Sequence, residues 1–545
     1  MGTVRINQMG YTPSSVKQVV YVGEAKNFQI FNILNNQLCY CGELKDQGSD
    51  EASEDRVCTG DFSFFQETGR FYIEVNGEKS LVFKISVKQH EICTDALLKA
   101  FYYQRCGMWL SAQYAGQWKH PICHLQPSYL FVQNAEKLLA SNPEELEQID
   151  TTGGWHDAGD YGRYTIAMVK TIADLLLAYE NCEAAFDHCI HIPESDLPGA
   201  DILHEIKYGL DFLFKMQRKL DGSVYTKVAT RFFPGMIMPE VDREPLFVFD
   251  ISSPATGGFA AVMAMAAGVF KQWDPAYAGR CLEAAKRAYS WLQQHPEPLL
   301  FHNPKDVISG EYGDSDDTDE RYWAAAQLYK VTGNEEYHKE FIRYYEELED
   351  RLSLGWRNVG GYGTIAYLFT EKPVDSIIHE DLGKEWLKYA SLLKERSKAN
   401  GYGITLALDE YKWGSLMILQ NQSIHLIIAN QLLKKQIYDA LIYYNWDYLL
   451  GVNPMDISYV TGLGERSVMN PHHRPSAADG ITEPVPGLVA GGPCSYLVDE
   501  IAEKLCKGNP PAKCYVDDEL SFSTNEIDIY WNSPAVFVAA YLSLR

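Results

Sequence analysis

Residues 151–164 read TTGGWHDAGDYGRY and place His156, Asp157 and Asp160 within five positions of one another. Two acids three positions apart on a glycine-rich turn can point at one small volume, where one carboxylate accepts a proton from water and the other orients that water. Inverting glycoside hydrolysis needs such a base, and a carboxylic acid across the scissile bond at about 6.5–9.5 Å. The alternative is that Asp157 or Asp160 caps a helix beginning near Tyr161.

A third acid, Glu526, lies in a loop ahead of Ser533-Pro534. An N-cap serine followed by proline at the first helical position predicts that the last helix begins there. A general acid needs a raised pKa, which apolar surroundings provide. Such surroundings could come from Ile527, Tyr530 and Trp531. Taken alone, however, a glutamate at this position is more often a solvated loop residue.

Two cysteines and two histidines could form a metal site: Cys106, Cys123, His124 and His156. Two thiolates and two imidazoles make a closed tetrahedral zinc site, so such a metal would be structural rather than catalytic. The pattern C-x16-C-H…H is not a standard zinc finger. The residue types therefore leave open a pair of buried cysteines with two hydrogen-bonded histidines, and His120 is a further imidazole nearby.

Two other polar or aromatic features could line a cleft. His472 and Arg474 belong to the sequence NPHHRP, and the planar guanidinium of an arginine can bridge hydroxyls or carboxylates. A histidine-rich surface loop is the simpler interpretation of this stretch. Trp413, in YKWGS, could line a cleft or pack in the core.

The acidic run GEYGDSDDTDERYW, residues 310–323, raises the question of calcium. It does not fit the EF-hand pattern, because no glycine stands where that loop must turn. A solvated acidic loop that caps a helix from Arg321 is the alternative. The motifs of serine hydrolases, nucleotide-binding loops and zinc proteases are absent from the chain.

The first 88 residues or so are expected to form β-strands. Short segments rich in Val, Ile, Phe and Tyr lie at 19–22, 28–33 and 71–75, and Asn76-Gly77 is typical of a hairpin turn. Several short strands in fewer than a hundred residues favour a small β-sandwich. No proline-rich linker follows, so we expect the two parts of the chain to pack together.

From about residue 93 the hydrophobic period becomes helical. Apolar residues recur at steps of three and four between Ile166 and Tyr179, and again over Leu432–Leu450, with Gly451 as a C-terminal stop. The apolar run 257–270 is too short to span a bilayer and predicts a buried helix. The long loops of residues 453–500 are expected to be functional.

Composition limits the classes of partner. Lys and Arg number 48 against 73 Asp and Glu, which gives a net charge of −25 and argues against nucleic acid and anionic membranes. Aromatic residues make up 13% of the chain, which suits binding of sugar rings as well as large cores. Because no signal peptide is visible, we expect either a secreted protein whose signal peptide is absent from this sequence or a cytoplasmic one. We expect a monomer.

Four segments together resemble glycoside hydrolase family 9, the inverting cellulases. GGWHDAGDYGRY resembles the family's catalytic-base motif, residues 453–476 its active-site histidine segment, and residues 522–534 its catalytic-acid segment. The start, VRINQMGYTPSS, is similar to the immunoglobulin-like domain that precedes the catalytic domain in one branch. The resemblance spans nearly the whole chain.

The resemblance implies a fold and a set of roles. It implies an immunoglobulin-like β-sandwich over residues 1–88 and an all-α (α/α)6 barrel over residues 93–545. Asp160 would be the general base, Asp157 would help hold the attacking water, and Glu526 would be the general acid. His472, Arg474 and Trp413 would contact the sugar.

The same branch implies two metals. Structural zinc would bind Cys106, Cys123, His124 and His156 and would anchor the turn that carries Asp157. Calcium would bind at Ser315, Asp319 and Glu320, the first through its backbone carbonyl.

The expected activity is therefore hydrolysis of β-1,4-glucosidic bonds in cellulose-like β-glucans with inversion, as an endoglucanase. One rival is an exo-acting β-glucosaminidase or cello-oligosaccharide exo-hydrolase of the same family, since strong acidity suits short cationic sugars. Another is a non-catalytic glycan-binding protein, which would not need both a base and an acid. A catalytic zinc hydrolase is disfavoured by the closed ligand set.

Overall fold

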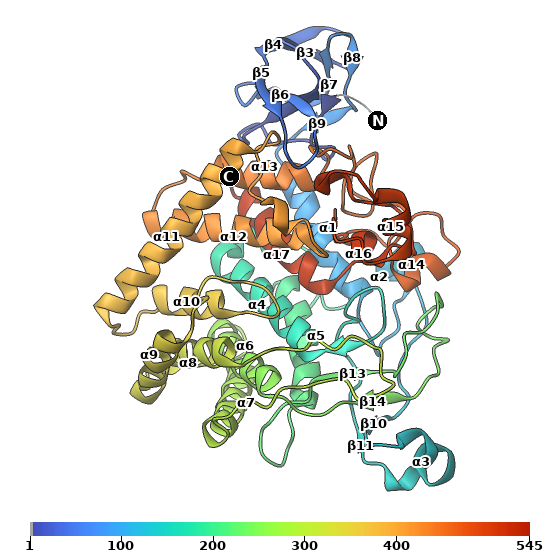
Figure 1. Cartoon of the computed structure of the whole chain (residues 1–545), viewed down its shortest axis with the longest axis vertical. Coiled ribbons are helices and arrows are strands. Elements are labelled where there is room, and N and C mark those ends of the chain that lie inside the picture. Colours follow the sequence, from blue (N-terminus) through green and yellow to red (C-terminus); the bar gives the residue numbers. More distant parts are fainter. Residues whose placement is uncertain (1–3) are drawn as a thin grey trace. The chain divides into compact units, whose positions relative to one another are not determined.

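The computed structural model describes residues 4–545. These residues form two compact units, and neither unit is one continuous stretch of chain. One unit contains residues 4–100, Asn181–Ile190 and Glu385–Arg545, and the other contains Phe101–Glu180 and His191–Lys384. Helices α1 (Gln89–Tyr103), α4 (Thr165–Cys182) and α11 (Ser376–Ala399) each have residues in both units. The strands β1 to β9 are blue in Figure 1.

The unit containing Phe101–Glu180 is built mainly from helices. Its principal helix pairs are α6 with α7, α6 with α8, and α8 with α9 and α10. Besides most of α4, its helices are α2 (Ala112–Ala115), α3 (Ala135–Ser141), α5 (Asp201–Met216), α6 (Ser253–Phe270), α7 (Pro275–Gln294), α8 (Thr318–Thr332), α9 (Glu335–Glu347) and α10 (Gly360–Leu368), with short 3-10 turns at η1 (Gly116–Trp118) and η2 (Pro143–Glu145).

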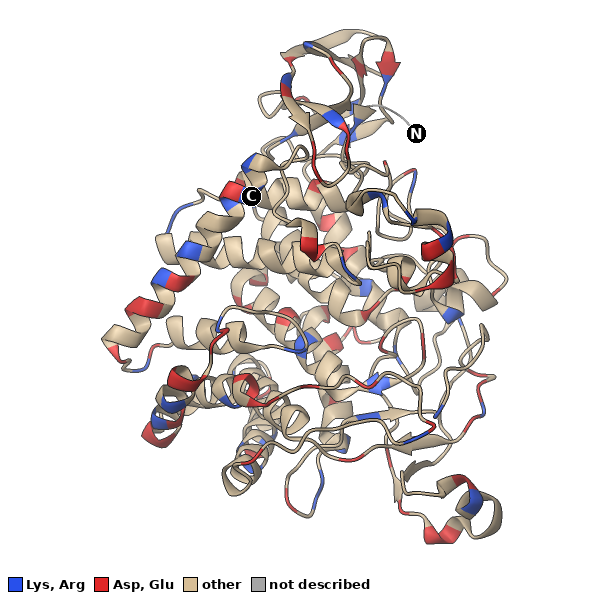
Figure 2. Cartoon of the chain, in the orientation of Figure 1, with Lys and Arg blue, Asp and Glu red and all other residues tan. Residues whose placement is uncertain are grey.

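Helix α6 is the core helix of this unit. It carries no acidic or basic residue, unlike α9 and α11, which show both signs of charge (Figure 2). Its N-cap, Ser252, accepts a hydrogen bond from the Ala255 N–H at 3.2 Å. By length and composition alone α6 could cross a membrane, but 89% of it is buried within the protein, as expected for a core helix.

A small five-stranded sheet in the same unit lies beside the sequence stretch that carries the aspartates. Its order is β11-β10-β14-β13-β12, with β10 and β14 parallel and the other pairs antiparallel. The strands are β10 (Ser128–Leu130), β11 (Gln148–Ile149), β12 (Arg163–Tyr164), β13 (Lys227–Ala229) and β14 (Leu246–Val248). Strand β12 ends where α4 begins, and it pairs Tyr164 with Lys227 of β13.

The other unit begins with a β-sandwich, as predicted. One sheet has the order β1-β2-β6-β5 and the second β4-β3-β7-β8, with β9 also paired to β7. The strands are β1 (Val4–Arg5), β2 (Gln18–Val22), β3 (Asn27–Asn32), β4 (Leu38–Glu43), β5 (Lys45–Ser49), β6 (Arg56–Asp61), β7 (Gly69–Val75), β8 (Glu78–Lys79) and β9 (Phe83–Ile85). Val19, Phe28 and Phe71 from both sheets share one buried core.

The C-terminal helices of this unit pack α12 against α13 and α17. They include α12 (Ser415–Leu433), α13 (Asp439–Leu449) and α17 (Ile529–Ser543), with the shorter α14 (Arg474–Ala478), α15 (Glu500–Cys506), α16 (Phe522–Asn525), η3 (Glu183–Phe186), η4 (Leu408–Glu410) and η5 (Pro511–Lys513). Both α12 and α17 are buried on nearly all sides, and the buried residues of α12 include the polar Gln420, Gln422 and His425.

Two helix boundaries differ from the sequence predictions. The last helix begins at Ile529, four residues before Ser533, because Asp528 is its N-cap and accepts from the Tyr530 N–H at 3.1 Å. Pro534 lies within the helix. The apolar pattern of residues 432–450 is not one helix, because Lys434 ends α12 in a left-handed conformation and α13 begins only at Asp439.

The β-sandwich and α13, which belong to one unit, are joined through a buried polar contact. The Asn7 side-chain amide donates to Oδ1 of Asp447 at 2.7 Å, and the Gln8 N–H donates to the Leu450 carbonyl at 2.9 Å. Asp447 is fully buried in α13, and burial raises its pKa to about 8. This carboxyl therefore stays protonated in the folded protein at neutral pH.

The raised pKa of Asp447 predicts that the stability of the protein depends on pH. An unfolded aspartate releases its proton near pH 4, whereas folded Asp447 holds it to about pH 8. Between these values the folded state binds more protons, so stability falls as pH rises, by up to about 1.4 kcal/mol per pH unit. Thermal unfolding from pH 5 to 8 should show a smaller fall in Tm for Asp447→Asn than for the wild type. Exposed Asp409→Asn is the control; equal slopes for all three proteins would contradict the assignment.

Candidate active site and metal site

The turn that carries both aspartates has no regular secondary structure between β11 and β12. Gly153 and Gly154 adopt φ values of 98° and 75°, which favour glycine. A Cβ on Gly154 would lie 2.7 Å from the Phe212 ring. Since α4 begins only at Thr165, neither Asp157 nor Asp160 is at a helix N-cap, and the capping alternative is wrong.

Backbone hydrogen bonds fix this turn against the segment that follows α1. The Cys106 N–H donates to the Gly154 carbonyl at 2.8 Å, and the His156 N–H donates to the Gln104 carbonyl at 2.7 Å. Gly107, with φ 78°, permits the close approach, because any other residue here would place a Cβ 2.8 Å from the Gly153 nitrogen. The two segments proposed to share a metal are therefore directly paired.

Each aspartate accepts a hydrogen bond from a tyrosine. Oδ2 of Asp160 accepts from the Tyr164 hydroxyl at 3.1 Å and from the Gly162 N–H at 3.1 Å. Oδ2 of Asp157 accepts from the Tyr312 hydroxyl at 2.5 Å. Burial and the nearby charges of Asp160 and Asp157 raise the pKa of Tyr164 well above its ordinary value, so this hydroxyl remains a donor.

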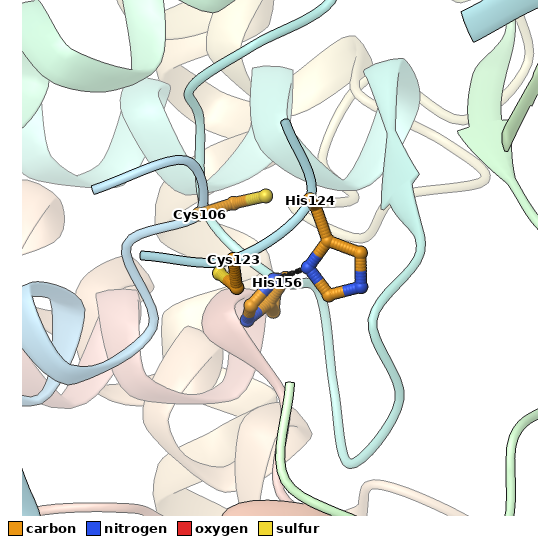
Figure 3. A group of neighbouring side chains, drawn as sticks. All are labelled: Cys106, Cys123, His124 and His156. Atoms are coloured by element: carbon orange, nitrogen blue, oxygen red, sulfur yellow. Dashed lines mark hydrogen bonds between the residues drawn. The ribbon is translucent and has the colours of Figure 1, made fainter. Parts of the chain in front are cut away.

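The four predicted zinc ligands lie together (Figure 3). All are buried, and one candidate ligand atom from each lies within 4.8 Å of the others: Cys106, Cys123, His124 and His156. In Figure 3 a hydrogen bond joins His156 Nε2 to His124 Nδ1, at 3.3 Å. His120 is outside this group, and its Nδ1 lies 2.7 Å from the Pro121 carbonyl.

The surroundings of this group are those of a metal site. Nε2 of His124 lies 3.5 Å from Oδ2 of buried Asp242, the carboxylate–histidine arrangement that orients metal-bound imidazoles. Burial opposes ionisation of Cys106, but the Cys123 thiol and the nearby Arg163 and His156 bring its pKa well below the ordinary value. A buried thiolate among imidazoles fits a soft or borderline cation such as zinc.

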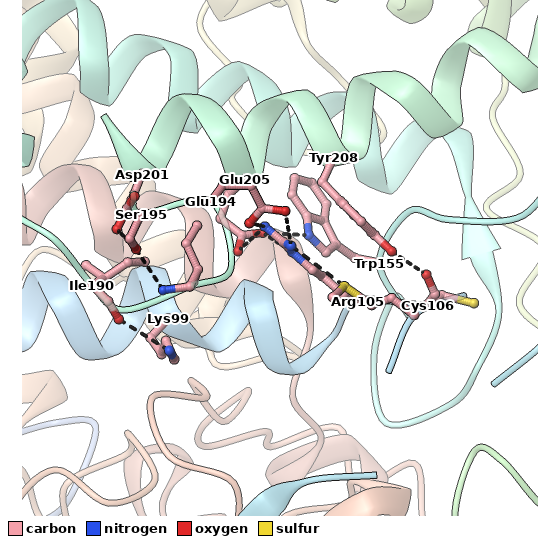
Figure 4. Close-up of polar contacts among 12 residues, drawn as sticks. Lys99, Arg105, Cys106, Trp155, Ile190, Glu194, Ser195, Asp201, Glu205 and Tyr208 are labelled. Atoms are coloured by element: carbon pink, nitrogen blue, oxygen red, sulfur yellow. Dashed lines mark hydrogen bonds and ion pairs between the residues drawn. The ribbon is translucent and has the colours of Figure 1, made fainter. Parts of the chain in front are cut away.

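A buried ion network from α5 supports both metal-bearing segments (Figure 4). Arg105 is wholly buried, and its guanidinium lies 2.9 Å from Glu205 and 3.0 Å from Glu194. Glu205 also accepts from the Trp155 indole N–H at 3.3 Å, and the Tyr208 hydroxyl donates to the Cys106 carbonyl at 2.6 Å. Residues next to Cys106 and His156 are thus fixed by one helix.

The acidic run leads into α8, which begins at Thr318 rather than at Arg321. Asp319 and Glu320 are buried in its first turn, whereas Ser315 is exposed. Asp319 accepts from the Val359 N–H at 2.6 Å, and the fully buried carboxyl of Glu320 interacts with the Asp319 carboxyl. Burial raises the pKa of Asp319 to about 7 and of Asp314 to about 6. Crowded buried carboxylates of this kind fit a hard cation.

In the unit of the C-terminal helices, Glu526 follows α16 directly. Its backbone is bridged on both sides, since the His472 N–H donates to the Asn525 carbonyl at 2.9 Å and the Gly491 N–H donates to the Glu526 carbonyl at 2.8 Å. Ile527 and Trp531 beside it are buried, as the sequence suggested. Glu526 is thus a partly buried residue on a fixed backbone and not part of a loose loop.

The predicted sugar-contacting residues differ in exposure. Trp413 is 46% exposed, which excludes core packing. Its ring centroid lies 5.3 Å from that of Phe522, and the Phe522 ring lies 6.2 Å from His472. His472 is partly exposed with Nδ1 2.5 Å from the Glu519 carbonyl, whereas Arg474 is nearly buried at the start of α14. An aromatic row thus connects Trp413 and His472 within this unit.

Sequence reasoning missed several residues that contact the predicted ones or hold the segments that carry them. They are Tyr164, Lys227, Asp242, Glu205, Tyr312, Asp314 and Phe522. Tyr164 ends the base motif and Tyr312 lies in the acidic run, so both were in stretches already singled out. Their pairing with the aspartates depends on tertiary contacts that residue spacing does not reveal.

Comparisons with known proteins identify the family. Residues 91–539 match the sequence model of glycosyl hydrolase family 9, and residues 1–80 match that of the cellulase N-terminal ig-like domain. The chain belongs to glycoside hydrolase family 9 and is an enzyme of the glycoside hydrolase class. The fold is accordingly an immunoglobulin-like β-sandwich followed by an (α/α)6 catalytic domain.

Individual relatives cover nearly the whole chain. It is 38% identical over 561 residues to a cellodextrinase of Butyrivibrio fibrisolvens, covering 98% of this chain and 99% of the relative. It is 33% identical to a xyloglucan-specific endo-beta-1,4-glucanase of Bacteroides ovatus, covering 99% of this chain and 93% of the relative.

Solved structures agree. The crystal structure of a thermostable endoglucanase from Alicyclobacillus acidocaldarius has a TM-score of 0.93 at 34% identity and covers 100% of both chains. A Zn-binding triple mutant of the family 9 endoglucanase J30 has a TM-score of 0.90 at 32% identity, covering 98% of this chain and 99% of the other.

Proposed function

We propose that this enzyme is an inverting endo-β-1,4-glucanase that acts on cellulose-like β-glucans. The observation that carries the proposal is the pair of buried aspartates on one glycine turn, each hydrogen-bonded to a tyrosine hydroxyl. This arrangement lies within a chain that matches family 9 over residues 91–539. Residues 1–88 would form the immunoglobulin-like domain and residues 93–545 the catalytic domain.

Asp160 is proposed as the general base. Its carboxylate accepts hydrogen bonds from two neutral donors, the Tyr164 hydroxyl and the Gly162 N–H, which hold it in place without adding a positive charge. Asp157, fixed by Tyr312, helps to hold the attacking water. The two acids of the turn therefore serve one water molecule.

Glu526 is proposed as the general acid. In an inverting enzyme the acid protonates the leaving oxygen while the base activates water on the other face of the sugar. Glu526 is partly buried, and the residues Ile527 and Trp531 that follow it in the chain are buried. A glycan-binding protein would need neither a fixed base nor a fixed acid.

Three residues are proposed to contact substrate: His472, Arg474 and Trp413. The exposed indole of Trp413 next to Phe522 offers an aromatic surface for a sugar ring. His472 precedes the buried Arg474 in the segment that pairs with Asn525, next to the general acid. These contacts would fix the sugar relative to Glu526.

We propose a structural zinc ion held by Cys106, Cys123, His124 and His156. Four protein ligands leave no open coordination position, so zinc would supply folding energy rather than a nucleophile. Its effect on catalysis would be indirect, because His156 directly precedes Asp157. Calcium is proposed at Ser315, Asp319 and Glu320, supported by the two adjoining buried carboxyls of Asp319 and Glu320.

A second candidate function is exo-hydrolysis of cello-oligosaccharides, which the 38% identity to a cellodextrinase favours. An exo-acting β-glucosaminidase remains a rival because the net charge of −25 suits cationic sugars. We take the enzyme to be a monomer, and secreted, since polymeric β-glucans cannot enter a cell.

A product time course tests the proposed function. The enzyme should rapidly lower the viscosity of carboxymethyl cellulose and give mixed cello-oligomers, because endo-action cuts within the polymer. Asp160→Ala, which removes the base, should be slower by about 100-fold or more and serves as the blank. Release of cellobiose or glucose alone from cellohexaose would favour exo-action. Glucosamine release from chitosan oligomers, without cleavage of glucans, would contradict the proposal.

Elemental analysis tests the metal assignment. The purified enzyme should contain about one zinc per chain, and Cys106→Ser should lose it and unfold at a lower temperature, because metal binding is coupled to folding. The matched control is Cys41→Ser, which changes an exposed cysteine of the β-sandwich. Full zinc content in Cys106→Ser would rule out this ligand set.

A further inference from the structure

One buried lysine has no role in the mechanism described so far. Lys227 lies on β13, directly opposite Tyr164 of β12 in the sheet, and its side chain is wholly buried. Its ammonium contacts four oxygens: Asn303 Oδ1 at 2.6 Å, the Gly310 carbonyl at 2.6 Å, the Ser309 carbonyl at 3.1 Å and Ser309 Oγ at 3.2 Å.

This environment is unusual for a buried cation. None of the four hydrogen-bond acceptors is a carboxylate, and the other neighbours are aromatic, with the Phe249 ring centroid 4.6 Å and the Tyr164 centroid 5.8 Å from Nζ. A buried charge without an ion-pair partner is costly, and an apolar side chain of similar length would be the cheaper way to fill this space. Stability alone therefore does not account for a lysine at this position.

Three of the four oxygens bound by Lys227 belong to Ser309 and Gly310, in the segment that reaches the two aspartates. The Gly310 N–H donates to the Tyr164 hydroxyl at 3.1 Å, and that hydroxyl in turn donates to Asp160. Two residues further on, the Tyr312 hydroxyl donates to Asp157. One ammonium thus fixes the backbone on which both tyrosine–aspartate contacts depend.

We propose that Lys227 is a positioning residue for the general base: it holds residues 309–312 so that Tyr164 and Tyr312 keep Asp160 and Asp157 in place. This inference rests on the proposed roles of the two aspartates. Lys227 contacts neither aspartate, so it can order the site while leaving the carboxylate of Asp160 with neutral donors only.

The charge of Lys227 adds a pH dependence. Burial lowers the pKa of Lys227 to about 7. The negative charges of Asp160 and Glu311 act in the other direction and raise it. Glu311 lies in the segment that Lys227 binds, and its carboxylate is 3.3 Å from His302 Nδ1. On the neighbouring strand β12, the titratable group that faces Lys227 is Tyr164. A neutral amine offers only two N–H groups to four oxygens. Positioning is therefore strongest well below pH 7, falls through the pKa and is weakest well above it.

Lys227→Met tests this role with cellohexaose as substrate. The variant should lose about 10- to 100-fold in kcat, because small displacements of reacting groups have effects of this size, while KM changes little. Lys330→Met removes a surface ion pair with Glu180 and should behave as the wild type. Wild-type kcat in a folded Lys227→Met protein would overturn the proposal.

A double-mutant cycle separates positioning from general destabilisation. If Lys227 acts through Gly310 and Tyr164, Lys227→Met and Tyr164→Phe together should be scarcely slower than the slower single variant. If the fold losses in kcat of the two single variants instead multiply in the double variant, the path through Gly310 and Tyr164 is contradicted.

Lys227→Arg, which stays charged, covers the case in which Lys227→Met does not fold. Its alkaline loss of kcat should lie at least one pH unit above that of the wild type. An unchanged alkaline limb would refute the role of the charge.

Asp160→Ala distinguishes the two levels of the proposal. If Asp160→Ala retains activity, the proposed function fails, whatever Lys227 does. If Asp160→Ala is inactive while Lys227→Met keeps wild-type kcat, only the positioning role fails.

Discussion

The buried carboxylates of Asp157 and Asp160 set the central demand on this fold. They are 1% and 6% exposed, and a buried carboxylate is tolerated only where hydrogen-bond donors replace the lost water. Oδ2 of each aspartate accepts from a tyrosine hydroxyl, and Oδ2 of Asp160 also accepts from a backbone N–H, so these donors add no positive charge. A cation in direct contact would lower the proton affinity that a general base requires.

A second demand follows from the irregular backbone of the turn. Because residues 151–162 belong to no helix or strand, their conformation depends on cross-links to other segments. The pairing of Cys106 with Gly154 and of His156 with Gln104 supplies two of these links. The Arg105–Glu205 ion pair behind them is buried on both sides, so losing one partner would leave an uncompensated charge. A zinc ion at the four ligands would add a further cross-link.

The sequence revealed more of the local chemistry than of the tertiary contacts. The β-sandwich and a buried helix at residues 257–270 were predictable, because each depends on residue type or period. The grouping of the four metal ligands was implied by the family resemblance, since their types and spacing alone left buried cysteines and hydrogen-bonded histidines open. Tyr164, Tyr312 and Lys227 were not predictable, since their partners lie between 4 and 155 positions away and only the folded sheet brings them together. The misplaced helix start at Ser533 shows a local signal overruled by the Asp528 cap.

The proposed mechanism has one carboxylate activate a water while another carboxyl group protonates the leaving oxygen on the opposite face of the sugar, which inverts the anomeric centre. Proton NMR of the first turnovers of cellohexaose hydrolysis tests this claim most directly, since new reducing ends form before mutarotation mixes the anomers. The account predicts that the α-anomer appears first from the β-linked substrate. Early appearance of the β-anomer would mean retention through a covalent intermediate and would contradict the assignment of Asp160 as a general base.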